Sequence, residues 1–204
     1  MKQLVKRIIF IIAVLIVLPL IILSKIGTSV LGTNGLFAFG SQCLAIVPGL
    51  LGTKLRTAYY SFTMEEFDPS CYTLFGTIFA DSRVRMKRYS KTGEYCIIGL
   101  CDIGERATIC SKVSILAGRY QHNFTDPTKD VFDSETVFER IKIGDGSFIG
   151  EGALVMADIG ENCIIGAGAV VVKEIPSYSV AVGNPAKVIK NRREDLKPEE
   201  ESKS

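Results

Sequence analysis

The sequence predicts a mainly β fold, a parallel β-helix built from six-residue repeats, preceded by an apolar helical segment and followed by a short charged tail. The first observation is a repeat that starts at Ile143. Each unit begins with an aliphatic residue, glycine usually follows, and Gly or Asn usually holds the fourth place: IGDGSF, IGEGAL, VMAD, IGENCI, IGAGAV and VVKEIP. The second is an uncharged run from Ile8 to Leu23. Neither strand alternation nor the helical repeat has a period of six residues, so the pattern predicts a solenoid.

The same repeat continues upstream from Thr92 as TGEYCI, IGLCD, IGERAT, ICSKVS and ILAGRY. Each unit predicts a short strand with its aliphatic residue inward, then a tight corner at which Gly and Asn tolerate a positive φ. Arg106 and Lys112 hold the fourth place in two units and make those corners less certain. Three units would complete one triangular coil, and successive coils would stack about 4.8 Å apart.

Composition excludes several classes of function. The net charge is +2, and no basic stripe with interleaved aromatic residues suggests nucleic acid. Six cysteines form no CxxC pair and a single histidine is available as a further ligand, so no metal site is predicted. The cysteines are expected to be reduced and to fill small interior positions.

Residues 1–56 are predicted to attach the chain to a membrane. A helix over 8–23 would span about 24 Å, against the ~30 Å of a hydrocarbon core. A cleaved signal peptide is the alternative. A second apolar stretch over 36–52 either completes a membrane hairpin, favoured here, or packs on the following domain. A single span would export that domain by the positive-inside rule, whereas a hairpin would return it to the starting side.

The repeat resembles that of the hexapeptide-repeat acyltransferases, and the ending IGAGAVVVKEIPSYSVAVGNPAKVIKNR resembles the last coil of the sugar, antibiotic and serine O-acetyltransferases. The resemblance covers residues 73–192 and implies a left-handed β-helix over 57–190, with a charged tail over 191–204. It also implies a homotrimer with its active sites between subunits. Acetyl-CoA would be the co-substrate, and no cofactor would be bound permanently.

The only histidine lies in a break of the repeat. Residues 119–140 leave the coil, and His122 lies in this projecting loop. The resemblance implies that His122 is the general base that takes the acceptor's proton, with no acyl-enzyme, because a thioester is already activated. Many relatives place the histidine where Tyr120 stands, so Tyr120 and Asn123 are assigned to substrate positioning. An inert or merely substrate-binding His122 is the alternative.

The resemblance also implies where CoA would bind. Small residues would let the pantetheine arm approach the coil wall: Ala153, Gly166, Ala167 and Gly168. The segment Gly183 to Lys187 would meet the nucleotide end of CoA. Lys173, Lys187 and Arg192 would face its phosphates as charge-assisted donors, with ordinary surface charges as the alternative.

The chain is therefore expected to be a membrane-attached O-acyltransferase that moves an acetyl group from acetyl-CoA to a hydroxyl of a sugar or of an envelope or exopolysaccharide precursor. Because acetyl-CoA is a cytoplasmic donor, we expect the bacterial cytoplasmic membrane, with the catalytic domain facing the cytoplasm. A γ-class carbonic anhydrase would need three histidines and is excluded. The remaining alternative is a non-catalytic trimeric β-helix scaffold in a membrane-bound polysaccharide assembly.

Overall fold

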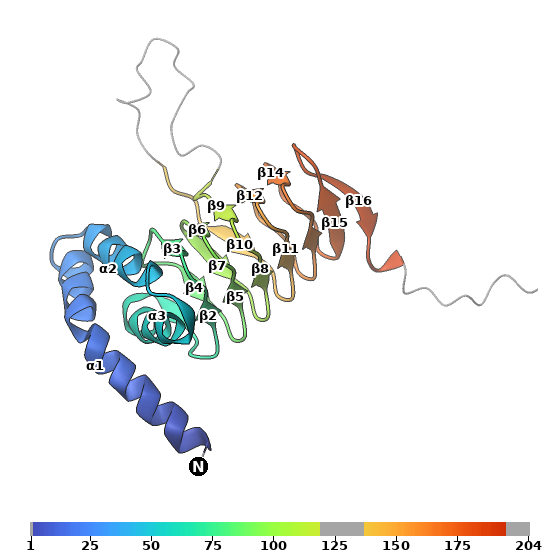
Figure 1. Ribbon diagram of the computed structural model, residues 1–204. Coiled ribbons are helices and arrows are strands. Elements are labelled where there is room, and N and C mark those ends of the chain that lie inside the picture. Colours follow the sequence, from blue (N-terminus) through green and yellow to red (C-terminus); the bar gives the residue numbers. More distant parts are fainter. Residues whose placement is uncertain (1, 119–136, 195–204) are drawn as a thin grey trace, which may run out of the picture.

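The computed structural model describes residues 2–118 and 137–194, which form a left-handed parallel β-helix with three helices at its N-terminal end (Figure 1). The predicted fold class is thereby confirmed. The predicted base His122 and its neighbours Tyr120 and Asn123 lie outside the described residues, as does most of the projecting loop.

The β-helix has three walls, each a sheet whose strands come from successive coils. Wall A consists of β1 (Glu66–Phe67), β4 (Arg85–Met86), β7 (Cys101–Ile103) and β10 (Ile141–Ile143). Wall B consists of β2 (Tyr72–Thr73), β5 (Lys91–Thr92), β8 (Thr108–Ile109), β11 (Phe148–Ile149), β13 (Ile164–Ile165), β15 (Ser179–Val182) and β16 (Lys187–Asn191). Wall C consists of β3 (Ile78–Phe79), β6 (Ile97–Ile98), β9 (Ser114–Ile115), β12 (Leu154–Val155) and β14 (Val170–Val171). All pairings are parallel except that of β15 with β16.

The corners follow the predicted register even where the residue type does not favour them. Arg106 and Lys112 adopt φ values of 57° and 59°, which lie in the left-handed region, as does the value of 53° at Asn162. Their side chains are largely exposed. The stacked coils above and below therefore impose the corner geometry, and the side chain only has to point outward.

The interior of the solenoid is filled by the first residue of each unit and by a smaller residue four places later. The cysteines Cys71, Cys96 and Cys163 occupy these smaller positions, and all three are buried free thiols. Cys101 is also buried and free. The prediction that the cysteines fill small interior positions is confirmed for these four.

The N-terminal segment differs from the expected hairpin. It forms α1 (Lys2–Ser29), α2 (Gly35–Ala45) and α3 (Gly49–Thr63), so the apolar stretch over 36–52 is divided between two helices. Figure 1 shows α2 and α3 against the first coils, with α1 running away from the solenoid. The expected boundary between residues 56 and 57 falls inside α3. The first coil begins at Glu66, before residue 73, where the resemblance in sequence begins.

Helices α2 and α3 pack on the first coils of the solenoid. Phe37 is fully buried, and Tyr60 stacks edge-on against Phe79 of the first coil at 4.8 Å between ring centroids. The Ser41 hydroxyl accepts a hydrogen bond from the backbone N–H of Phe79 at 2.9 Å and pairs with the Tyr60 hydroxyl. These helices cap the open end that every solenoid must protect. Among the described helices, only α1 is long and apolar enough to cross a membrane.

Candidate active site

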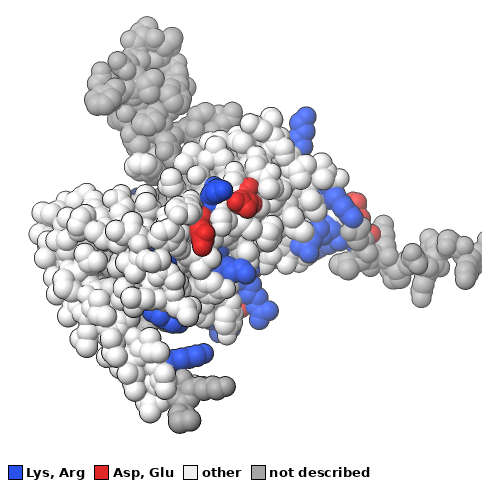
Figure 2. Space-filling view, in the orientation of Figure 1, with Lys and Arg blue, Asp and Glu red and all other residues white. Residues whose placement is uncertain are grey.

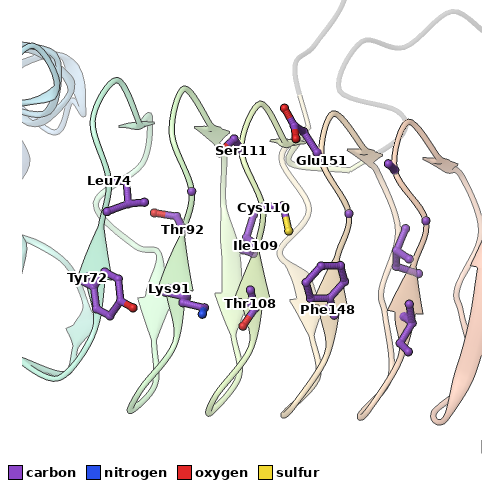
Figure 3. A pocket seen from close by; sticks show the side chains of 16 residues that line it. Tyr72, Leu74, Lys91, Thr92, Thr108, Ile109, Cys110, Ser111, Phe148 and Glu151 are labelled. Atoms are coloured by element: carbon purple, nitrogen blue, oxygen red, sulfur yellow. The ribbon is translucent and has the colours of Figure 1, made fainter.

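The candidate active site is a groove of about 590 Å³ along wall B (Figure 3). It runs parallel to the solenoid axis, because its lining comes from β2, β5, β8, β11 and β13 of five successive coils. The outward side chains of these strands form its floor: Tyr72, Lys91, Thr108, Phe148 and Ile164. Such a groove suits a long, narrow ligand lying across several coils.

One side of the groove is formed by the corners at which the chain leaves wall B. A Cβ atom added at Gly93 would lie 2.4 Å from the backbone N of Ser111, and one at Gly150 would lie 2.5 Å from the backbone N of Ala167. The coils therefore stack too closely there for any side chain. At these two glycines the groove therefore has no side chain, and a ligand can approach the backbone closely there.

Polar groups are spread along the groove. Lys91 and Thr108 project from its floor, and Ser111 and Glu151 lie along the corners (Figure 3). The Ser111 hydroxyl accepts a hydrogen bond from the backbone N–H of Glu94 at 3.1 Å. The Glu151 carboxylate lies 3.5 Å from the Lys112 ammonium. The lining thus combines apolar contact with a few hydrogen-bonding groups, as ligand pockets generally do.

The structure separates the small residues assigned to CoA. Gly166 and Ala167 line the groove. Gly168 lies one residue further on, at an exposed corner with φ of 67°. Ala153 is only 1% exposed and its side chain points into the coil interior, so its methyl group cannot contact a ligand on the wall. Lys173 is exposed but is not part of the groove lining.

The C-terminal residues assigned to CoA lie on a hairpin that extends wall B. Gly183 lies in the turn between β15 and β16 with φ of 96°, and its carbonyl accepts a hydrogen bond from the backbone N–H of Val170 at 3.0 Å. Lys187 begins β16 and is exposed. Arg192 donates from Nη1 to the Asn162 carbonyl at 2.5 Å, so it holds the hairpin against a corner. Because β15 pairs with β13, this hairpin follows directly from the last strand of the groove.

A second cavity, of about 320 Å³, lies where the chain departs into the projecting loop. Ala117, which precedes the loop, and Phe138, near its returning end, line the cavity together with Asp81 and Asn34. Burial would raise the pKa of the Asp81 carboxyl, but hydrogen bonds from the Arg83 backbone and guanidinium outweigh it and lower that pKa. The sequence alone does not single out Asp81 and Asn34, because neither lies in a conspicuous motif and Asn34 precedes α2 in the helical cap.

Four charged residues tie the returning end of the loop to the solenoid. The Arg140 guanidinium donates to the Asp102 carboxylate at 2.5 Å and to the Glu65 carboxylate at 2.8 Å. Glu65 also accepts a hydrogen bond from Arg85, which is the main cause of its lowered pKa. The chain that re-enters wall A after the loop is therefore fixed to β4 and β7 and to the end of the helical cap.

Comparisons with known proteins agree on the architecture. No protein-family model matches the chain, and no curated protein matches it by sequence. Among solved structures, a maltose O-acetyltransferase from Clostridium difficile 630 is similar with a TM-score of 0.66 and 23% identity, over 76% of this chain and 84% of that chain. A hexapeptide-repeat-containing acetyltransferase from Vibrio cholerae gives 0.52 and 16%, over 76% and 90%.

A third structure is a mutant of the N-acyltransferase AntD from Bacillus cereus, in complex with dTDP-4-amino-4,6-dideoxyglucose and coenzyme A. It gives a TM-score of 0.50 and 16% identity, over 66% of this chain and 80% of that chain. The resemblance to hexapeptide-repeat acyltransferases is thereby confirmed at the level of the fold.

Proposed function

We propose that this chain is a CoA-dependent O-acyltransferase that moves an acetyl group from acetyl-CoA to a sugar hydroxyl. The observation that carries the proposal is the axial groove on wall B of a β-helix whose solved neighbours are acetyl- and acyltransferases. One of those neighbours was solved with coenzyme A and an amino-sugar nucleotide.

The groove supports the proposal because its shape fits the pantetheine arm of CoA. The arm is long and thin, with methylene groups and two amides, and the groove crosses five coils with both apolar and hydrogen-bonding residues. Gly166 and Ala167 would let the arm lie close to the backbone. The nucleotide end would extend toward the hairpin of β15 and β16, where Lys187 is available to the phosphates as a charge-assisted donor. Lys173 would serve from the neighbouring corner.

The proposed reaction needs one proton acceptor. His122 would take the proton of the sugar hydroxyl as its oxygen attacks the thioester carbonyl, and the tetrahedral intermediate would then expel the CoA thiolate. The thiolate would receive the proton from His122, which restores the base. A backbone N–H at a coil corner would stabilise the oxyanion. No acyl-enzyme is required.

The cavity at the root of the projecting loop is the proposed acceptor site. It combines an apolar surface, on which the hydrophobic face of a sugar ring can pack, with the Asp81 carboxylate and the Asn34 amide, which can bind hydroxyl groups. It also lies where the chain departs toward residues 119–136, which include His122.

A homotrimer with its sites between subunits is consistent with the outer surfaces of the walls. Wall A presents charged residues, including Arg85 and Asp102, which form ion pairs. Wall C presents aliphatic residues outward, and Ile97 among them is 54% exposed. An apolar wall of this kind favours burial against another subunit. Wall A would then face solvent.

The N-terminal helix supports attachment to a membrane. α1 contains 28 residues and an uncharged apolar run from Ile8 to Leu23. Acetyl-CoA is made in the cytoplasm, so the proposed location is the cytoplasmic membrane with the solenoid on the cytoplasmic side. Protease added to intact spheroplasts should leave a C-terminal tag uncut; cleavage of the tag would place the domain outside.

The proposed activity is tested with the full chain purified in detergent. Release of free CoA from acetyl-CoA would be followed with a panel of sugars and nucleotide sugars, beside His122→Ala. Loss of a general base should lower acceptor-dependent release about 100-fold or more. Release that survives the substitution would contradict the role of His122. Absence of both CoA binding and release would favour the non-catalytic scaffold.

A further inference from the structure

The corner between α2 and α3 exposes aliphatic side chains that the protein itself does not cover. Leu50 is 83% exposed, the highest value of any large apolar side chain among the described residues, and Ile46 and Leu51 are 74% and 62% exposed. Isolated exposed leucines are common, but three within six residues form a patch. A patch of this kind is typical of a surface that meets a membrane or a partner.

This corner is held rigidly in place. Arg56 is fully buried behind it and donates to the carbonyls of Leu44 at 2.7 Å, Val47 at 2.9 Å and Thr73 at 3.0 Å, so it joins the corner to the first coil. A Cβ atom at Gly52 would lie 1.8 Å from the Val47 carbonyl oxygen. A corner packed this closely cannot fold back to hide its leucines.

The exposed corner continues into the surface of α1. A groove of about 340 Å³ between α1 and α3 is lined by Ile9, Ile12, Ala13, Ile16, Leu50, Leu51, Lys54 and Leu55. All of these are aliphatic except Lys54. The α1 residues of this groove fall within the uncharged run Ile8–Leu23. Whatever environment accommodates that run therefore also reaches Leu50 and Leu51.

The charge of this region indicates which environment it is. Residues 1–64 contain six basic residues and no acidic residue, so all 22 acidic residues of the chain lie beyond them. Figure 2 shows the acidic side chains over the solenoid and at its C-terminal end, while the helical end shows basic side chains on an uncharged surface. A basic, otherwise apolar surface is complementary to anionic phospholipids.

We propose that the α2–α3 corner is a second membrane-inserted element, and that the groove between α1 and α3 binds an acyl chain of an anionic phospholipid whose phosphate faces Lys54. The corner would enter the bilayer beside α1, although α2 itself packs on the solenoid. Two attachment points would hold the first coil of the β-helix directly at the membrane surface. The inference rests on the membrane attachment proposed above and is independent of acyl transfer.

The chain contains no tryptophan, so a single introduced tryptophan reports depth without background. Leu50→Trp and Ile189→Trp are matched, since both positions are highly exposed and Ile189 lies on β16 at the opposite end. The full chain would be placed in phosphatidylcholine–phosphatidylglycerol vesicles. Lipids brominated in their acyl chains should quench the tryptophan at position 50 and leave that at position 189 unaffected.

Head-group preference tests the lipid site itself. At equal surface fractions, brominated phosphatidylglycerol should quench Leu50→Trp more than brominated phosphatidylcholine, with an enrichment of about fivefold from one lysine. Lys54→Gln in the same background should abolish this preference. If the two lipids quench Leu50→Trp equally while Lys54 is still present, the proposed contact between Lys54 and the phosphate is overturned.

An unquenched Leu50→Trp beside a quenched Leu15→Trp on α1 would overturn the inserted corner and leave α1 as the sole anchor. A blue-shifted but unquenched tryptophan at position 50 would overturn it in favour of a protein partner, including a second copy of this chain. CoA release measured in the same vesicles separates the two proposals, because quenching does not depend on catalysis.

Discussion

Replacing Arg140 by methionine tests how the returning end of the projecting loop is fixed. The guanidinium donates to Asp102 at 2.5 Å, to Glu65 at 2.8 Å and to the Arg83 carbonyl at 2.8 Å. Methionine keeps most of the side chain's apolar contact and removes all three hydrogen bonds. The change therefore isolates the polar contribution of the guanidinium.

The expected cost follows from the number of contacts and their exposure. Hydrogen bonds to charged groups contribute about 1.5–3 kcal/mol each when buried. The Arg140 side chain is 25% exposed and its partners Asp102 and Glu65 are 24% and 37% exposed, so solvent screening reduces this strongly. We expect a loss of about 1–2 kcal/mol in the free energy of unfolding, or roughly 2–8 °C in Tm for a chain of this size.

Lys142→Met is the matched control, because Lys142 is exposed and lies only two residues further on, in β10. Lys142→Met should change the free energy of unfolding by no more than about 0.5 kcal/mol in either direction, as surface substitutions usually do. Its Tm should therefore stay close to that of the parent chain. Thermal unfolding in detergent at pH 7 compares the two variants with the parent chain. Equal Tm values for Arg140→Met and Lys142→Met would refute the reasoning.

The same variant has a defined pH dependence. The hydrogen bond from Arg85, and then the one from Arg140, lowers the pKa of Glu65 in the folded chain. A carboxyl whose pKa is lower when folded contributes stability above its unfolded pKa, about 4.3, and loses it as pH falls through the folded value. The Tm difference between the parent chain and Arg140→Met should therefore narrow below about pH 4. A difference that stays constant from pH 7 to pH 3 would show that Glu65 is not the partner that matters.

Two further predictions concern the groove. Ala167→Leu places a larger side chain at an exposed position in the lining of the groove. The KM for acetyl-CoA should therefore rise at least about tenfold, while Tm stays unchanged. An unchanged KM would show that CoA binds elsewhere. Iodoacetamide at pH 8, read by mass spectrometry, should label Cys43 and Cys110 first, because the other four thiols are buried. CoA should slow labelling of Cys110, which lines the groove, and not that of Cys43.

The sequence predicted the solenoid because its period is repeated many times and each repeat obeys the same local physics. The interior aliphatic residues, the corner glycines and the interior cysteines all follow from that period. The predicted domain began at residue 57, but the repeat itself was followed upstream only to Thr92. In the first two coils Thr73 and Met86 take inward places and Tyr89 takes a corner at φ of 59°, which hides the repeat. One or two atypical units hide a period in the sequence, whereas in the structure the neighbouring coils impose it.

The candidate site was only partly predictable, for a related reason. Gly166 and Ala167 lie on the groove because their places in the repeat put them at a wall corner, which a repeat pattern can specify. Smallness alone did not distinguish Ala153, whose side chain points into the coil, from the small residues that face the groove. Asp81 and Asn34 come together from a coil and a helical cap, and no spacing along the chain encodes that contact.

The helical end shows where composition alone fails. An apolar stretch such as 36–52 can be buried in a bilayer or against protein, and both lower the same free energy by removing apolar surface from water. The structure divides the stretch: Phe37 and Leu44 pack against the protein, whereas Ile46, Leu50 and Leu51 face outward. That division depends on the first coil, which supplies Phe79 and Thr73 as partners. A single segment can therefore cap the solenoid with one side and meet a membrane with the other. The two interpretations of the sequence, a membrane hairpin or a segment packed on the domain, treated these roles as mutually exclusive.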